Sequence, residues 1–164
     1  MSKTQIHCSF DLTAPGKRHG FLHVPYSYNL AGWANLLIPI TVIANGRGPT
    51  ALVLAGNHGD EYPGQIAIMK LTREVQPEMV TGRLILIPAL NLPAARTATR
   101  LSPIDGKNMN RAFPGNPDGT VTEMIADYVT TVLFPIADIV IDIHTGGRSL
   151  GFVPCSTMHL VQDR

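Results

Sequence analysis

The sequence predicts an α/β fold in which helices flank a mixed, largely parallel sheet. Four short runs are rich in Ile, Leu and Val without alternating with polar residues, which is typical of strands buried on both faces. Longer segments with helical spacing lie between these runs, and such alternation favours a sheet covered by helices. The four predicted strands are Leu36–Ala44, Ala51–Ala55, Arg83–Ala89 and Ile139–Ile143.

The segments between the strands carry helix start and stop residues. One helix is predicted to begin near Pro63, since proline is favoured in the first turn of a helix. A second is predicted to start at Thr120 or Thr122, because either hydroxyl could cap its first turn. Pro135 should end this second helix.

The chain of 164 residues suits a single domain. Residues 1–35 are expected to form an N-terminal lead-in, irregular apart from one short strand near Gly20–Val24. Residues 36–164 are expected to form the α/β domain. In such sheets ligands bind at the carboxyl ends of the strands, so the chemistry is expected there.

Composition and charge exclude several functional classes. Apolar residues make up 45%, charged residues 15%, and the net charge is +1 without any block of like charge. Nucleic acid and anionic membranes are therefore not expected partners. The two cysteines form no C-x-x-C pair, and the N-terminus lacks a signal peptide, so a soluble cytoplasmic protein is expected. The sequence leaves the oligomeric state open, a homo-oligomer included.

Two predicted strands are followed directly by segments rich in histidine and glycine. Ala51–Ala55 runs into a turn that holds His58 and Glu61, and Ile139–Ile143 runs into His144. Imidazole nitrogens and carboxylate oxygens are ligands of Zn²⁺, and three protein ligands that leave a fourth position for water are the pattern of a catalytic site. The sequence therefore predicts one zinc ion per chain, held by these three side chains.

Each part of this set also has a simpler explanation. A lone His-x-x-Glu often arises by chance or by capping, and a lone histidine such as His144 is more often a hydrogen-bonded loop or core residue. Asp142 lies two residues before His144, so its side chain leaves the strand on the same face and could orient that ring. A capping or turn role explains Asp142 equally well.

A second polar cluster lies between residues 91 and 115, in a segment rich in Gly, Pro, Arg and Asn. Two arginines and an asparagine could form a clamp for an anionic substrate, since the guanidinium fork binds carboxylates through two hydrogen bonds. Without the zinc site, a solvated loop with surface arginines would explain the same pattern better.

Three motifs together resemble the succinylglutamate desuccinylase/aspartoacylase family, relatives of the zinc carboxypeptidases. They are GNHGDE (56–61), TRLSPIDGKNMNRAFPG (99–115) and DIHTGG (142–147), and they occur in the family's order. The resemblance runs from about Ile38 to the end of the chain. It implies a zinc-exopeptidase-like fold, and within the family the sequence looks closest to the deacetylases of ectoine breakdown, which act on Nα-acetyl-2,4-diaminobutyrate.

The resemblance also implies roles for individual residues. The three candidate ligands match the family's zinc ligands. Asn110 and Arg111 match the pair that holds the substrate carboxylate, and Arg100 looks like the arginine that polarises the scissile carbonyl. The implied partner is a small N-acylated amino acid.

One departure from the family concerns the catalytic base, a Glu that follows the third ligand. Here the last Glu is Glu123, and Asp163 is the only acid after His144. The sequence is therefore expected to be the N-terminal part of the fold, truncated on its C-terminal side and nearly inactive alone. Apolar surface is expected to be exposed at Phe152, Val153, Met158 and Leu160.

The function predicted from the sequence is a zinc-dependent hydrolase, or amidohydrolase, that cleaves the amide bond of a small N-acylated amino acid. A deacetylase of the Nα-acetyl-2,4-diaminobutyrate type is favoured. Two alternatives stay open: a zinc carboxypeptidase acting on peptides, and a metal-binding remnant without turnover.

Overall fold

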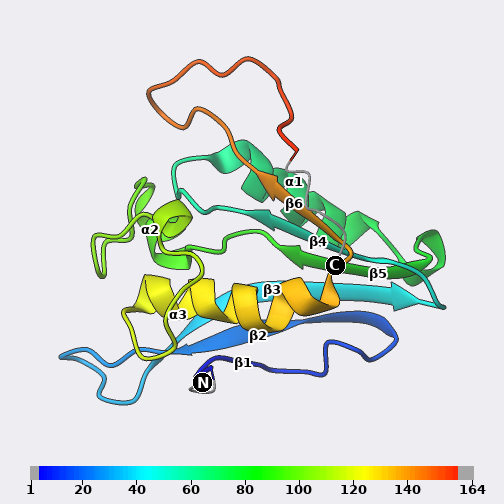
Figure 1. The fold of residues 1–164 in the computed structure, drawn as a ribbon, viewed down its shortest axis with the longest axis horizontal. Coiled ribbons are helices and arrows are strands. Elements are labelled where there is room, and N and C mark those ends of the chain that lie inside the picture. The colour runs from blue at the N-terminus through cyan, green and yellow to red at the C-terminus, as the bar shows by residue number, and fades with distance from the viewer. Residues whose placement is uncertain (1–3, 159–164) are drawn as a thin grey trace.

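A mixed sheet of six strands forms the centre of the protein (Figure 1). The structure is a computed structural model that describes residues 4–158, so Leu160 and Asp163 lie outside the described residues. Across the sheet the strands follow the order β1 (His7–Cys8), β2 (Gly16–Pro25), β3 (Asn35–Asn45), β5 (Gly82–Ile87), β4 (Thr50–Ala55) and β6 (Ile139–Ile143).

The sheet is mixed, as predicted, but only β5, β4 and β6 run parallel to one another. The pairs β1–β2, β2–β3 and β3–β5 are antiparallel. Parallel neighbours need a long crossover, which α1 provides between β4 and β5, whereas β2 and β3 follow one another across a single loop. The expectation of a largely parallel sheet was therefore wrong for the N-terminal half.

The strand expected near Gly20–Val24 is longer, because β2 spans ten residues and pairs with β3 along its whole length. Because its first half contains the polar residues Lys17, Arg18 and His19, β2 shows no continuous apolar run in the sequence. An antiparallel strand can turn one face to water and so carries polar side chains that a buried parallel strand does not. Leu22 and Val24 are nevertheless fully buried in the main core.

Helices cover both faces of the sheet, as predicted (Figure 1). The first, α1 (Tyr62–Glu74), buries Ile68 against one face, and α3 (Val121–Tyr128) packs into the larger core on the other. From α3 the helical path continues through a π turn at Val129–Leu133 and a 3₁₀ turn at Phe134–Ile136, one residue beyond Pro135. Shorter helical elements are η1 (Pro77–Met79), α2 (Leu92–Thr97) and η2 (Met109–Arg111).

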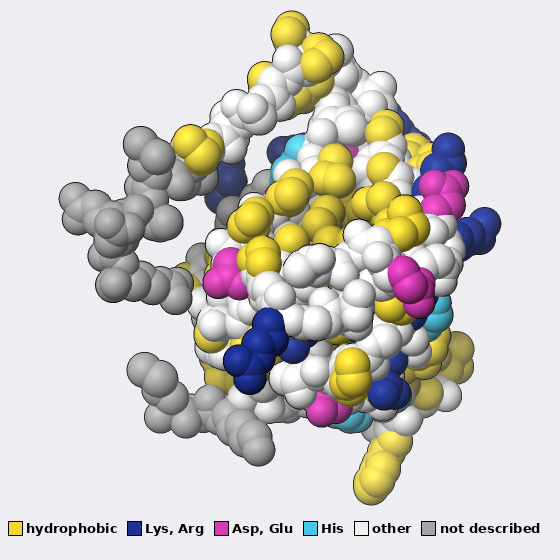
Figure 2. Space-filling view, turned by 90° about the vertical axis from the view of Figure 1, so that its right-hand side faces the viewer, with side chains coloured by type: hydrophobic (Ala, Val, Ile, Leu, Met, Phe, Trp, Pro, Cys, Tyr) yellow, Lys and Arg dark blue, Asp and Glu magenta, His cyan; other side chains and the backbone are white. Residues whose placement is uncertain are grey.

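Strand β6 forms one edge of the described sheet and exposes apolar side chains. Ile139, Val140 and Ile141 are each 45–52% exposed. The segment after β6 projects from the body, with hydrophobic side chains gathered beneath it (Figure 2). Phe152, Val153 and Met158 are exposed there, as the sequence analysis expected. None of the helices in residues 4–158 is long and apolar enough to cross a membrane.

Asp105 ties the loop before η2 to the start of α3. Its carboxylate accepts hydrogen bonds from the backbone N–H and the hydroxyl of Thr122, both at 2.8 Å. Partial burial alone would raise the pKa of Asp105, but the hydrogen bonds that its carboxylate accepts, first those from Thr122, together outweigh burial and lower the pKa. We expect Asp105→Ala to reduce the free energy of unfolding by about 1–2 kcal/mol, measured by urea denaturation.

The stabilising effect of Asp105 is expected to depend on pH. Because its pKa is lowered in the folded state, the effect is complete above the pKa of the unfolded chain, about 3.9, and is lost as pH falls through the folded-state value. The control is Glu74→Ala, which removes an exposed carboxylate at the end of α1. Equal stability losses in the two variants at pH 7 would contradict the role given to Asp105.

Candidate functional site

The turn after β4 and the end of β6 place the predicted metal ligands next to each other. Strands β4 and β6 are parallel neighbours, so their carboxyl ends meet at the same edge of the sheet. His58 lies in the turn after β4, Glu61 immediately precedes α1, and His144 follows β6. Gly59 has to be glycine here, because a Cβ at this position would lie 2.0 Å from the backbone of Ala94 in α2.

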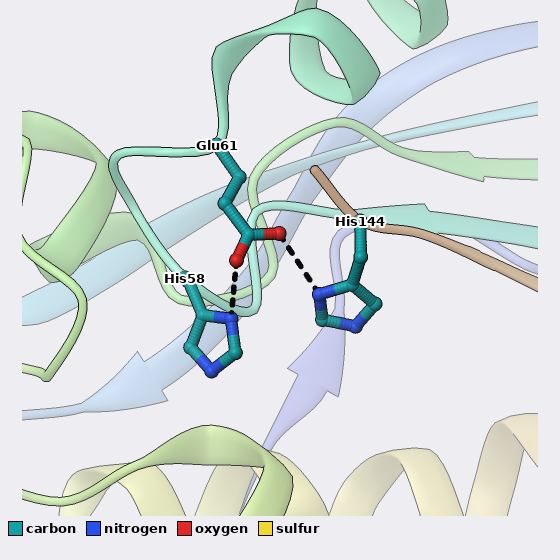
Figure 3. A group of neighbouring side chains, drawn as sticks. All are labelled: His58, Glu61 and His144. Atoms are coloured by element: carbon teal, nitrogen blue, oxygen red, sulfur yellow. Dashed lines mark hydrogen bonds and ion pairs between the residues drawn. The ribbon is translucent and has the colours of Figure 1, made fainter. Parts of the chain in front are cut away.

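The three side chains point toward a common centre (Figure 3). Nδ1 of His58 lies 2.7 Å from Oε1 of Glu61, and Nδ1 of His144 lies 2.9 Å from Oε2 of the same carboxylate. His58 and Glu61 are each only 3% exposed, so this carboxylate is withdrawn from water. A buried carboxylate between two imidazoles is a stable arrangement only with a cation or protons at its centre.

The donor set fits a zinc ion. One ligand atom from each of the three residues lies within 4.8 Å of the other two, and no other group of three His, Cys, Asp or Glu residues in the described part of the chain does so. Bonds of roughly 2.0–2.2 Å to a central ion require a spacing of this order. Two nitrogens and one carboxylate oxygen are also the mixture that zinc accepts at catalytic sites.

Asp142 contacts the ring of His144 and so lies where it can orient this candidate ligand. Its Oδ2 lies 2.8 Å from Nε2 of His144, and this hydrogen bond is the main reason that the pKa of the His144 ring is raised. Glu61 is held as well, since its Oε2 accepts a hydrogen bond from the backbone N–H of Thr145 at 2.9 Å. Groups around the centre thus fix two of the three candidate ligands in place.

Two asparagines near the centre were not singled out from the sequence. Buried Asn57 donates from Nδ2 to Asp142 at 2.6 Å and to Oδ1 of Asn110 at 3.0 Å. Asn108 lies 3.1 Å from the other side of the His58 ring. Their partners are 50 to 85 positions away in the sequence, so no local pattern could have identified them.

Arg100 lies directly beside two of the candidate metal ligands. Its Nη1 is 3.3 Å from Nδ1 of His58 and 3.5 Å from Oε1 of Glu61, while its side chain stays 55% exposed. A guanidinium in this place can reach a molecule bound at the centre without losing contact with solvent. The role expected for Arg100, polarisation of the scissile carbonyl, remains a prediction.

Asn110 and Arg111 belong to η2 and open onto the same region. Together with Asn57 and Asp142 they line a cavity of about 570 Å³ whose apolar wall includes Phe113. Arg111 is exposed, and its Nη1 donates a hydrogen bond to the backbone carbonyl of Asn110 at 3.3 Å. The guanidinium is therefore available to an anion that enters the cavity.

Comparison with known proteins identifies the family. Residues 47–164 match the succinylglutamate desuccinylase/aspartoacylase catalytic domain. The chain belongs to this family. It is 49% identical over 158 residues to the N-alpha-acetyl-L-2,4-diaminobutyric acid deacetylase of Halomonas elongata, an alignment that covers 96% of this chain and 46% of the relative. It is also 34% identical over 100 residues to murein peptide amidase A of Vibrio campbellii, covering 60% of this chain and 38% of that protein.

Solved structures of family members share the fold. The product-bound ectoine utilization protein EutE (DoeB) of Ruegeria pomeroyi superposes with a TM-score of 0.95 and 50% identity, covering 99% of this chain and 50% of that one. A succinylglutamate desuccinylase from Silicibacter sp. TM1040 gives a TM-score of 0.88 and 51% identity, covering 90% of this chain and 45% of that one. The chain thus spans about half the length of these relatives.

Proposed function

We propose that this chain binds one Zn²⁺ through His58, Glu61 and His144 and carries the metal and substrate-anion sites of a deacetylase. The substrate class is a small N-acylated amino acid of the Nα-acetyl-2,4-diaminobutyrate type. The observation that carries the proposal is the convergence of the three ligand atoms around one point. The 49% identity to a deacetylase supports the substrate class.

Each residue of the site has a distinct task in this proposal. When bound, zinc supplies Lewis acidity toward an amide carbonyl and toward water. Arg100, beside the ligands, donates hydrogen bonds to the carbonyl oxygen and so stabilises the negative charge that develops there. Asn110 and Arg111 bind the substrate carboxylate and hold the amide at a fixed distance from the centre.

The carboxylates nearest the centre are already engaged. Glu61 faces both histidines, and Asp142 accepts from His144 and from Asn57. A general base must accept a proton from the attacking water and pass it to the leaving amine. Both carboxylates are bound by other groups, so neither is assigned the role of general base in this proposal.

The substrate class can be tested by binding, independently of turnover. We expect the zinc-loaded chain to bind Nα-acetyl-2,4-diaminobutyrate in isothermal titration calorimetry, and to bind its carboxamide derivative, which lacks the carboxylate, much more weakly. Tighter binding of a peptide than of the acetylated amino acid would favour the peptidase alternative. The likeness to murein peptide amidase A is the observation that keeps this alternative open.

Arg111 is expected to contribute binding through its charge. We expect Arg111→Ala to weaken binding of the acetylated amino acid by about 1.5–3 kcal/mol, roughly 10- to 150-fold, since a charge-assisted hydrogen bond to the carboxylate is lost. The matched control is Arg47→Ala, an exposed arginine in the turn between β3 and β4 at the opposite end of the strands. Equal affinities of the wild type and Arg111→Ala for the acetylated amino acid would show that Arg111 does not bind the substrate carboxylate.

A further inference from the structure

Asn108 touches both the metal centre and the substrate-binding turn. It is the N-cap residue of η2, and its Oδ1 accepts a hydrogen bond from the backbone N–H of Asn110 at 3.0 Å. The same oxygen lies 3.1 Å from Nε2 of His58. One amide group therefore joins a candidate metal ligand to the turn that presents Asn110 and Arg111.

The backbone contact fixes which way the amide of Asn108 faces. The oxygen and nitrogen of an asparagine side chain are assigned from their hydrogen-bond partners. A backbone N–H can only donate, so the atom that receives the bond from Asn110 has to be the oxygen. Since this oxygen also faces His58, the ring must be the donor in that contact, and its Nε2 carries a hydrogen.

A hydrogen on Nε2 leaves Nδ1 of His58 to face the metal position. Nδ1 is the atom that lies 2.7 Å from Glu61 and 3.3 Å from the guanidinium of Arg100, on the side where the three ligands meet. We propose that Asn108 is a positioning residue that holds the Nε2–H form and the orientation of the His58 ring, and so strengthens metal binding through Nδ1. This inference rests on the proposed zinc site.

The second histidine has the same arrangement with a different partner. Nε2 of His144 faces the carboxylate of Asp142, which can only accept when ionised, so its hydrogen also points away from the centre. Both rings therefore turn Nδ1 inward, one held by a neutral amide and the other by a carboxylate. Such outer partners of metal-bound histidines typically change metal affinity by roughly 10- to 100-fold when they are removed.

Three substitutions separate the contact with His58 from the cap on η2. Asn108→Asp keeps an oxygen for both contacts. Asn108→Ser keeps a favourable cap, but its hydroxyl stands one bond closer to the backbone and does not reach His58. Asn108→Leu is similar in size and makes neither contact. We expect zinc affinity, measured by competition with a chelator, to be equal or higher in the Asp variant and roughly 10- to 100-fold lower in the Ser and Leu variants.

The protonation of the ring can be measured without metal or activity. In ¹⁵N-correlated NMR spectra of the imidazole rings, with His58 assigned from a His58→Gln variant, we expect Nε2 of His58 to be protonated in the zinc-free chain and to remain so with zinc. A bare Nε2 in the wild type would overturn the proposal, as would wild-type zinc affinity in Asn108→Ser. Protonated Nε2 in a chain that takes up no zinc would instead refute the proposed function and support the ring assignment.

Discussion

Removing any one of the three candidate ligands is expected to reduce bound zinc from about one ion per chain to nearly none. His58→Ala, Glu61→Gln and His144→Ala each leave two protein ligands, which are too few for the three-ligand pattern of catalytic zinc. Metal content after equilibration with a moderate chelator, measured by mass spectrometry, is the readout. Glu61→Gln is the mildest change, because it keeps the size of the side chain and removes only its charge.

A histidine outside the site provides the matched control. His19 lies on β2, on the antiparallel side of the sheet, and contacts Thr41. His19→Ala removes the same chemical group as His58→Ala and should leave the zinc content unchanged. Full zinc occupancy in all three ligand variants would show that the ion binds elsewhere.

The chain alone is expected to turn over its substrate slowly. We expect the zinc-loaded 164-residue chain to release acetate from Nα-acetyl-2,4-diaminobutyrate at least about 10²-fold more slowly than the intact Halomonas elongata deacetylase. General acid–base catalysis contributes about 10²–10⁴-fold, and both carboxylates at the centre, Glu61 and Asp142, are held by other groups. The readout is acetate formed per chain at matched zinc content.

Folding has to be controlled in this comparison. Circular dichroism and zinc content of the same sample show whether the chain is folded and loaded, so low turnover cannot be assigned to loss of structure. Turnover within about tenfold of the intact deacetylase would mean that an unassigned group accepts the proton.

Much of this architecture could be predicted from local sequence patterns. The apolar runs at β3 to β6 and the proline at the start of α1 are local features, and the rule that parallel strands end at one edge brings His58 and His144 together. The prediction of the mixed sheet with helices on both faces is confirmed. The roles of the individual site residues remain predictions.

Other features could not be predicted from local patterns because they depend on tertiary contacts. Strand β2 carries Lys17, Arg18 and His19 in its first half, so its ten residues show no continuous apolar run. Asn57 and Asn108 acquire their roles only when the loop of residues 99–115 folds back over the turn after β4. Asparagine is common in turns and caps, and nothing in the residue itself distinguishes a partner of a metal ligand from a turn residue.

The most direct test of the zinc site is a crystal structure of the chain loaded with zinc, with anomalous data collected at the zinc absorption edge. We expect a single strong anomalous peak bonded to Nδ1 of His58, a carboxylate oxygen of Glu61 and Nδ1 of His144, at roughly 2.0–2.2 Å. A peak at other residues, or side chains of these three that stay in direct contact without an ion between them, would contradict the proposed metal centre.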